Sequence, residues 1–268
     1  MRLPDIFRPD FRIDSRPVVT QVVPAIMSEA IPPVEPQPPK RPIAWVTWTI
    51  LVSTVAVFLY QLQMYRTRGY DVIGDTLAFS PEALADHRYW TLVTYAWVHA
   101  VAMFGDSSLF WLHIAANMIF LYCLGPALEI FLGHWRYLGL YLGGAIGAAL
   151  FWYLFTPTGD FDQGIIGASG AIFALIAGAG TAAPRERVTV YLFYVLPIAM
   201  TLRTMALVIC GLELVQLVLE RIPSIANQPF FSGWLTEIAH SAHLGGAFFG
   251  FLYVMGLRFW ALRSAVRH

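Results

Sequence analysis

One serine lies in a glycine-rich segment where its hydroxyl could act as a nucleophile. Residues 164–174 read Gly-Ile-Ile-Gly-Ala-Ser-Gly-Ala-Ile-Phe-Ala, with the hydroxyl at Ser169. Gly167 and Gly170 place no side chain on either side of it, so a substrate backbone could approach the hydroxyl and backbone N–H groups could face a developing oxyanion. A glycine-rich helix start without chemistry is the alternative. Other polar residues of the chain are needed to distinguish a nucleophile from a glycine-rich helix start.

Four further polar side chains lie near the starts of apolar segments elsewhere in the chain. They are His113, Asn117, His240 and His243. A histidine beside a serine can accept the hydroxyl proton, and amide or imidazole N–H groups can donate to an oxyanion. Polar groups in a membrane are costly, and they tend to face one another or a cavity. These residue types therefore predict nucleophilic acyl transfer if the fold brings the segments together.

The composition predicts an integral membrane protein. Hydrophobic residues make up 57% of the chain and charged residues 13%, whereas soluble domains carry about 25% charged residues. No residue between Gln163 and Pro184 carries a formal charge, and about 20 apolar residues allow a helix to cross a bilayer. The 17 basic residues balance 17 acidic ones, so no basic surface for nucleic acid is expected. The expected environment is the lipid bilayer.

Six apolar segments are predicted to be transmembrane helices, so the predicted fold class is an all-α membrane protein with a six-helix bundle. They are residues 42–65, 109–132, 137–155, 169–183, 202–219 and 238–257. The fifth is the least convincing, because Arg203, Glu213 and Gln216 interrupt it. Residues 69–108 mix aromatic and polar side chains, which predicts a first loop that lies in the membrane interface.

The flanks of this bundle give the predicted domain organisation. Residues 1–41 hold nine of the 17 prolines and are predicted to form a disordered, proline-rich tail. The six-helix domain is predicted at 42–262 and a second tail at 263–268. The distribution of basic residues favours cytoplasmic N- and C-termini. The expected location is a bacterial inner (plasma) membrane, and no oligomeric state is predicted.

Helix direction and register bring the polar residues together. In a six-span chain the second, fourth and sixth helices run the same way, so residues near their starts lie at one membrane face. On the sixth helix, His243 heads a stripe of small residues that continues through Gly246 and Gly250, and the serine helix has a matching stripe at Gly170 and Ala174. Packing along these stripes is predicted to bring the serine and this histidine together.

Three motifs in this order resemble those of the rhomboid family of intramembrane serine proteases. The family's Gly-x-Ser-Gly matches residues 167–170, its Ala-His-x-x-Gly matches residues 242–246, and its His-x-x-x-Asn matches residues 113–117. The resemblance covers roughly residues 42–260.

The resemblance implies a serine endopeptidase that cleaves transmembrane segments of membrane-protein substrates near the outer face of the bilayer. Ser169 would be the nucleophile and His243 the base, and the oxyanion would be held by Asn117, His113 and the backbone at Gly167. No aspartate on the predicted helices is placed to orient the histidine, so a Ser-His dyad is expected, with no cofactor and no metal. The family's substrates carry helix-destabilising residues in the membrane segment and a small residue before the cut.

Three other functions were weighed against this one. A rhomboid-like protein that binds membrane segments without cleaving them would lack the serine or the histidine, and both are present. A zinc hydrolase could use His240 and His243, but zincins have Glu inside His-Glu-x-x-His, whereas Ser241 and Ala242 stand between these histidines. A channel or transporter would show paired charges or repeated broken helices, and the sequence has no internal repeat.

One departure from the family pattern lies in the first external loop. The family usually has Trp-Arg there, whereas Trp90 is followed by Thr91. The contribution of that arginine is expected to be absent or to come from Arg88.

The loop after the fifth helix joins aromatic side chains to a flexible Gly233. The aromatic residues are Phe230, Phe231 and Trp234. They could close the site from above and, with the fifth helix, move aside to admit a substrate laterally. An interfacial aromatic anchor without a gating role is the alternative.

Overall fold

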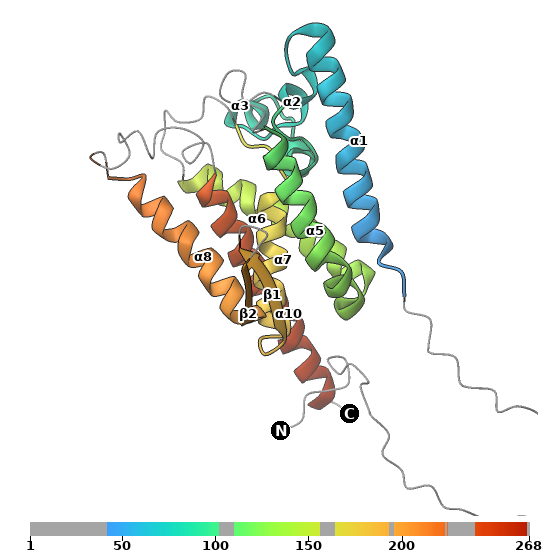
Figure 1. Cartoon of the computed structure of the whole chain (residues 1–268), viewed down its shortest axis with the longest axis vertical. Coiled ribbons are helices and arrows are strands. Elements are labelled where there is room, and N and C mark those ends of the chain that lie inside the picture. The colour runs from blue at the N-terminus through green and yellow to red at the C-terminus, as the bar shows by residue number, and fades with distance from the viewer. Residues whose placement is uncertain are drawn as a thin grey trace, which may run out of the picture.

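The protein is an integral membrane protein built as a bundle of long helices (Figure 1). The computed structural model describes residues 42–101, 110–155, 164–192, 196–222, 224 and 239–266, so the predicted tail at 1–41 lies outside the described residues. The long helices are α1 (Trp45–Arg68), α5 (Phe110–Leu132), α6 (His134–Phe155), α7 (Ser169–Ala182), α8 (Leu202–Leu219) and α10 (His240–Val266).

Helix α7 lies in the interior of the bundle. It packs against α5, α6, α8 and α10, and most of its residues are buried. Its 14 residues make it about 21 Å long, shorter than the hydrocarbon core of a bilayer. Five of the described helices are long and apolar enough to cross a membrane, and α7 is the shorter apolar helix. The count of six membrane spans therefore stays a prediction.

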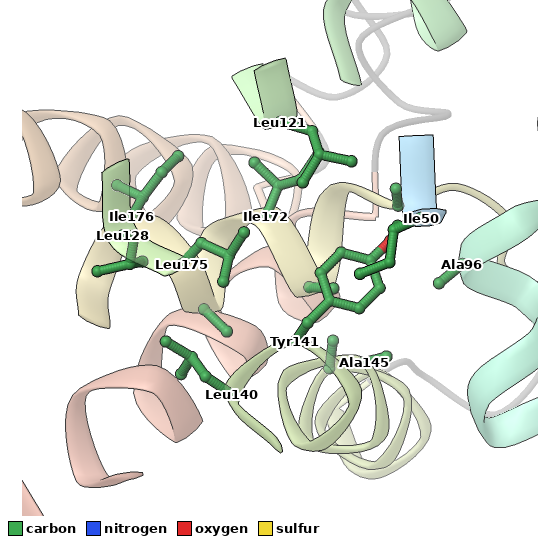
Figure 2. Close-up of a cluster of buried hydrophobic side chains, with 14 of the residues drawn as sticks. Ile50, Ala96, Leu121, Leu128, Leu140, Tyr141, Ala145, Ile172, Leu175 and Ile176 are labelled. Atoms are coloured by element: carbon green, nitrogen blue, oxygen red, sulfur yellow. The ribbon is translucent and has the colours of Figure 1, made fainter. Parts of the chain in front are cut away.

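Apolar side chains from several helices meet around α7 (Figure 2). Ile172, Leu175 and Ile176 of α7 belong to the same buried cluster as Leu121 of α5 and Tyr141 of α6. This core fixes the position of α7, whose first residue is the candidate nucleophile.

The predicted helix positions agree best for α5, α7 and α8, and they differ most at the end of the chain. Helix α10 extends nine residues beyond the predicted end at Leu257. Its basic residues have partners there, because Arg258 donates to a backbone carbonyl of α7 (2.9 Å) and Arg263 lies 4.4 Å above the ring of Phe259. These two basic residues therefore lie on α10 and do not end it.

The all-α prediction is wrong for the segment between α7 and α8. Strands β1 (Arg187–Leu192) and β2 (Leu196–Thr201) form an antiparallel hairpin there, paired over their full length. β-Branched residues such as Val188 and Val190 favour strands. Pro197 is compatible with β2 because both strands of a two-stranded sheet are edge strands.

The described part of the first loop, residues 69–101, contains four short helices. They are α2 (Val72–Leu77), α3 (Pro81–Ala85), α4 (Thr91–Thr94) and the 3-10 helix η2 (Tyr95–Trp97). Arg88 donates to the carbonyl oxygen of Asp75 (3.0 Å), and the Thr91 hydroxyl donates to the carbonyl oxygen of Arg88 (2.7 Å). Arg88 therefore links α2 to the start of α4. It does so in a chain that has threonine, and not arginine, after Trp90.

A carboxylate on α5 caps the start of α1. Glu129 accepts hydrogen bonds from the backbone N–H groups of Val46 (3.0 Å) and Thr47 (2.7 Å) and from the Thr47 hydroxyl (2.7 Å). The first N–H groups of a helix have no partner within the helix, so this buried carboxylate satisfies two of them. His134 at the start of α6 also contacts Glu129 (2.5 Å). One residue therefore joins α1, α5 and α6.

Candidate active site

The starts of α7 and α10 touch through their backbones. A Cβ atom placed on Gly246 would lie 1.9 Å from the carbonyl oxygen of Gly170, and one on Gly250 would lie 2.2 Å from that of Ala174. No side chain fits at such distances, so glycine is required at both positions of α10. The predicted packing of the two small-residue stripes is confirmed.

Ser169 and His243 form a hydrogen-bonded pair at this contact. Nε2 of His243 lies 2.8 Å from Oγ of Ser169. The imidazole stacks on Phe173, with ring centroids 4.3 Å apart and planes 8° from parallel. Phe173 lies one turn after Ser169 on α7, so the same helix carries the hydroxyl and the surface that holds the imidazole. This geometry suits a nucleophile and its base.

A carboxylate from α8 lies on the other side of His243. Oε2 of Glu213 is 2.8 Å from Nδ1 of His243 and 2.6 Å from Nδ1 of His240. An ionised carboxylate only accepts hydrogen bonds, so Nδ1 of His243 carries the proton and Nε2 of the neutral ring presents its lone pair to Ser169. Ser169, His243 and Glu213 therefore form a chain of nucleophile, base and carboxylate.

This contact corrects the expectation of a dyad without an orienting carboxylate. No aspartate lies on the predicted helices, and in the sequence Glu213 is only one of three residues that interrupt the fifth predicted span. An ionisable residue inside an apolar helix is by itself a signal of a functional site, and this signal could have identified Glu213. The sequence alone does not give the rotation of α8 about its own axis, and this rotation decides whether Glu213 faces the bundle or the lipid.

His240 extends the cluster to a second carboxylate. Its Nε2 lies 3.2 Å from Oε1 of Glu220, the residue that follows α8. The side chain of His240 is almost fully buried, and burial raises the pKa of Glu220. The structure thus places His240 between Glu213 and Glu220.

His113 and Gly167 meet beside the serine. Gly167 has φ 110°, a conformation that favours glycine, and a Cβ atom there would lie 2.6 Å from Nε2 of His113. The amide of Asn117 is buried one turn further along α5, where it donates to the carbonyl oxygen of His113 (2.8 Å). This bond uses one of its two amide hydrogens. Oxyanion binding by the three residues stays a prediction.

The first loop positions the segment that precedes Ser169. Phe79 and Ile165 exchange two backbone hydrogen bonds (3.1 and 2.7 Å). The N–H of Gly167 donates to the carbonyl oxygen of Tyr95 (2.9 Å), and the Tyr95 hydroxyl donates to the carbonyl oxygen of Ala145 on α6 (2.8 Å). The backbone that would face a substrate is therefore fixed from two sides.

His99 supports the same segment from the end of the first loop. Its Nε2 accepts a long hydrogen bond from the N–H of Ala168 (3.5 Å), and its backbone N–H and C=O both bond to the Gln61 side chain of α1. Burial lowers the pKa of His99 to about 3, with a smaller contribution from His113. A neutral imidazole is required here, because only a nitrogen without a proton can accept from Ala168.

Two further results concern the remaining predicted site residues and metal binding. The gate residues Phe230, Phe231 and Trp234 lie outside the described residues. Within the described part of the chain, the residues that could hold a metal ion are Glu213, His240 and His243, whose ligand atoms lie within 4.8 Å of one another.

Known proteins resemble this chain over the region that carries the site. The family model of the Rhomboid domain matches residues 86–259. Presenilin-associated rhomboid-like protein A, mitochondrial, from Danio rerio is 31% identical over 144 residues, which cover 53% of this chain and 33% of the relative. RHOMBOID-like protein 5 from Arabidopsis thaliana is 25% identical over 272 residues, covering 88% of this chain and 77% of the relative.

A third relative is also a mitochondrial protein. Presenilin-associated rhomboid-like protein, mitochondrial, from Bos taurus is 29% identical over 155 residues, covering 58% of this chain and 36% of the relative. The chain thus spans about a third of the length of the mitochondrial relatives that it matches. The matched family region contains Ser169, Glu213 and His243.

Proposed function

Because the chain belongs to the rhomboid family, we propose that it is an intramembrane serine endopeptidase. It cleaves transmembrane segments of membrane-protein substrates near the outer face of the bilayer, within a bundle of six membrane-spanning helices. The observation that carries the proposal is the 2.8 Å contact between Ser169 and His243, with Glu213 on the far side of the imidazole. The expected bacterial plasma membrane stays a prediction, since two of the relatives named above are described as mitochondrial.

The reaction uses the two nitrogens of His243 in different ways. Nε2 accepts the Ser169 proton while Oγ attacks the carbonyl carbon of the scissile peptide bond. Glu213 holds Nδ1–H and stabilises the imidazolium that forms. The imidazolium then gives its proton to the leaving amine, and a water molecule attacks the acyl-enzyme with the same base.

The oxyanion needs donors on the side of Ser169 that faces away from His243. We assign this role to the backbone N–H of Ser169 and to the side chains of His113 and Asn117. The N–H of Gly167 already donates to Tyr95, so Gly167 contributes space beside His113 rather than a donor. The close approach of His113 to Gly167 supports this assignment. The gate role of Phe230, Phe231 and Trp234 is proposed from the sequence alone.

A mechanism-based serine hydrolase probe tests the proposal. The wild-type protein should be labelled and should cleave a reporter membrane substrate, whereas Ser169→Ala should lose both labelling and cleavage. His243→Ala should lose cleavage as well, and both variants should keep the thermal stability of a folded protein. Full cleavage by either variant would overturn the mechanism.

The same experiment separates this function from the alternative, a rhomboid-like protein that binds membrane segments without cleaving them. A non-catalytic binder would associate with the reporter substrate but show no Ser169-dependent labelling. The hydrogen-bonded contact between serine and histidine favours the enzyme, because a binding protein has no need for it.

A further inference from the structure

We propose that Glu213, His240 and His243 form a zinc site whose occupation switches the active site off. The inhibition rests on the proposed function, whereas the binding of zinc does not.

The three side chains converge on one point from two helices. His240 and His243 are three residues apart on α10, so they share a helix face, and Glu213 faces them from α8. Oε2 of Glu213 lies 2.6 and 2.8 Å from the two Nδ1 atoms. Zinc binds imidazole nitrogen and carboxylate oxygen at about 2.0–2.2 Å, so two ligands of a tetrahedral ion are roughly 3.4 Å apart. Shifts of less than about 1 Å therefore convert the hydrogen-bonded cluster into a ligand set.

The outer partners of the two imidazoles complete the site. Metal-bound histidines usually donate their second N–H to a carboxylate or another acceptor, which fixes the ring. Nε2 of His240 faces Glu220 at 3.2 Å, and Nε2 of His243 faces the Ser169 hydroxyl at 2.8 Å. Both rings thus already turn Nδ1 toward the shared carboxylate and Nε2 toward an oxygen.

Two histidines and one carboxylate form a known ligand set of zinc and suit it better than magnesium or calcium. Imidazole is a favoured ligand of zinc, whereas magnesium and calcium prefer sites made only of oxygen atoms. Three protein ligands also leave one position of a tetrahedral zinc ion for water.

Zinc at this site removes the catalytic base. A metal ion on Nδ1 of His243 takes the lone pair of that nitrogen, so the ring proton moves to Nε2. Nε2 then donates to Ser169 and can no longer accept its proton. Zinc also occupies the Glu213 carboxylate, which would otherwise stabilise the imidazolium. The enzyme is active when the site is empty and inactive when it is filled.

Metal binding is tested first, without any need for activity. The full chain, purified without a polyhistidine tag and carrying Ser169→Ala, is titrated with cobalt, whose visible absorption reports tetrahedral coordination. One equivalent should bind, and zinc should displace it. His240→Ala and Glu213→Ala should each lose this spectrum. His87→Asn should keep it, because His87 is exposed and asparagine tolerates its positive φ of 62°.

Binding by the His240→Ala and Glu213→Ala variants with wild-type affinity would overturn the site. Cobalt binding that is lost only in His87→Asn would do the same.

Inhibition is tested second, in a protein that cleaves the reporter substrate. Zinc should stop wild-type cleavage and EDTA should restore it. In His240→Ala, measured against its own zinc-free rate, half-inhibition should need at least about tenfold more zinc. Wild-type turnover that is unchanged when cobalt spectra show a filled site would overturn the switch. A protein that binds metal but never cleaves would instead contradict the proposed function and leave the metal site standing.

Discussion

At His243 the two ring nitrogens face different partners, and this difference decides which of them can act as a base. Glu213→Gln keeps the size of the side chain but removes the charge that stabilises the imidazolium. We expect kcat to fall by about 100-fold or more with little change in KM. Glu220→Gln is the matched control, because Glu220 contacts His240 and not His243, and it should retain most of the turnover. Wild-type kcat in Glu213→Gln would show that the carboxylate has no part in catalysis.

His99 makes stability depend on pH. In the unfolded chain its pKa is near 6.5, whereas burial lowers the pKa of His99 in the folded protein to about 3. Between these values the unfolded state binds more protons, so stability falls as the pH falls through this window. From pH 7 to pH 5 the free energy of unfolding should drop by on the order of 2 kcal/mol because of this residue.

Thermal unfolding in detergent at pH 7 and pH 5 measures this effect. His99→Gln cannot be protonated, so its melting temperature should fall less between the two pH values than that of the wild type. His87→Asn removes an exposed histidine and should show the wild-type fall. Equal falls in wild type and His99→Gln would contradict the assignment.

Among the elements, the contact between α7 and α10 sets the distance between nucleophile and base. A Cβ atom on Gly246 would lie 1.9 Å from a backbone oxygen of α7, so Gly246→Ala must push the helices apart. We expect a loss of about 1–3 kcal/mol in stability and a large loss of kcat, because the Ser169 contact lengthens.

Gly256→Ala provides the matched control on the same helix. A Cβ atom there meets nothing within 4 Å, and alanine favours a helix over glycine by about 1 kcal/mol. Its melting temperature should be equal to or higher than that of wild type, with unchanged turnover. If Gly246→Ala behaves like Gly256→Ala, the glycine contact does not position the site.

The helices themselves differ in how far the sequence determines them. The uncharged run at 164–183 predicts α7 closely, and the apolar run at 202–219 predicts α8 despite Arg203 and Glu213. The small-residue stripes correctly place His243 against the serine helix, since close packing leaves few alternatives. Glu213 was misinterpreted because α8 is apolar on most of its surface, and only its packing on α7 and α10 fixes which side faces inward. The hairpin was missed because an apolar run with β-branched residues is compatible with either a helix or a strand until its pairing partner is known.

At the scale of the whole molecule, α8 is the least buried of the five long helices that could cross a membrane. Of its most apolar 18 residues 17% are buried, compared with 33 to 39% in the other four long helices. It lies at one edge of the bundle, and α1 lies at the other (Figure 1). A substrate helix that enters beside α8 would therefore displace the least buried of these helices.

Phe231→Ala tests whether the loop after α8 restricts that entry. If its aromatic side chains close the site, cleavage of a membrane reporter should rise severalfold, while hydrolysis of a short soluble peptide at Ser169 should not change. Trp135→Ala is the control, because Trp135 is an aromatic residue at the start of α6 with 74% of its surface exposed. An unchanged rate with the membrane reporter would favour the interfacial anchor over the gate.

The carboxylate that caps α1 is synthesised well after the residues that it caps. Thr47 and Glu129 are 82 residues apart in the chain, so at about 5–20 residues per second the ribosome needs roughly 4 to 16 s to add the second after the first. During that interval the N–H groups at the start of α1 must bond to water or lipid headgroups. Helix α1 therefore waits for a cap that lies 82 residues further along the chain, and any pause in translation between the two residues prolongs this wait.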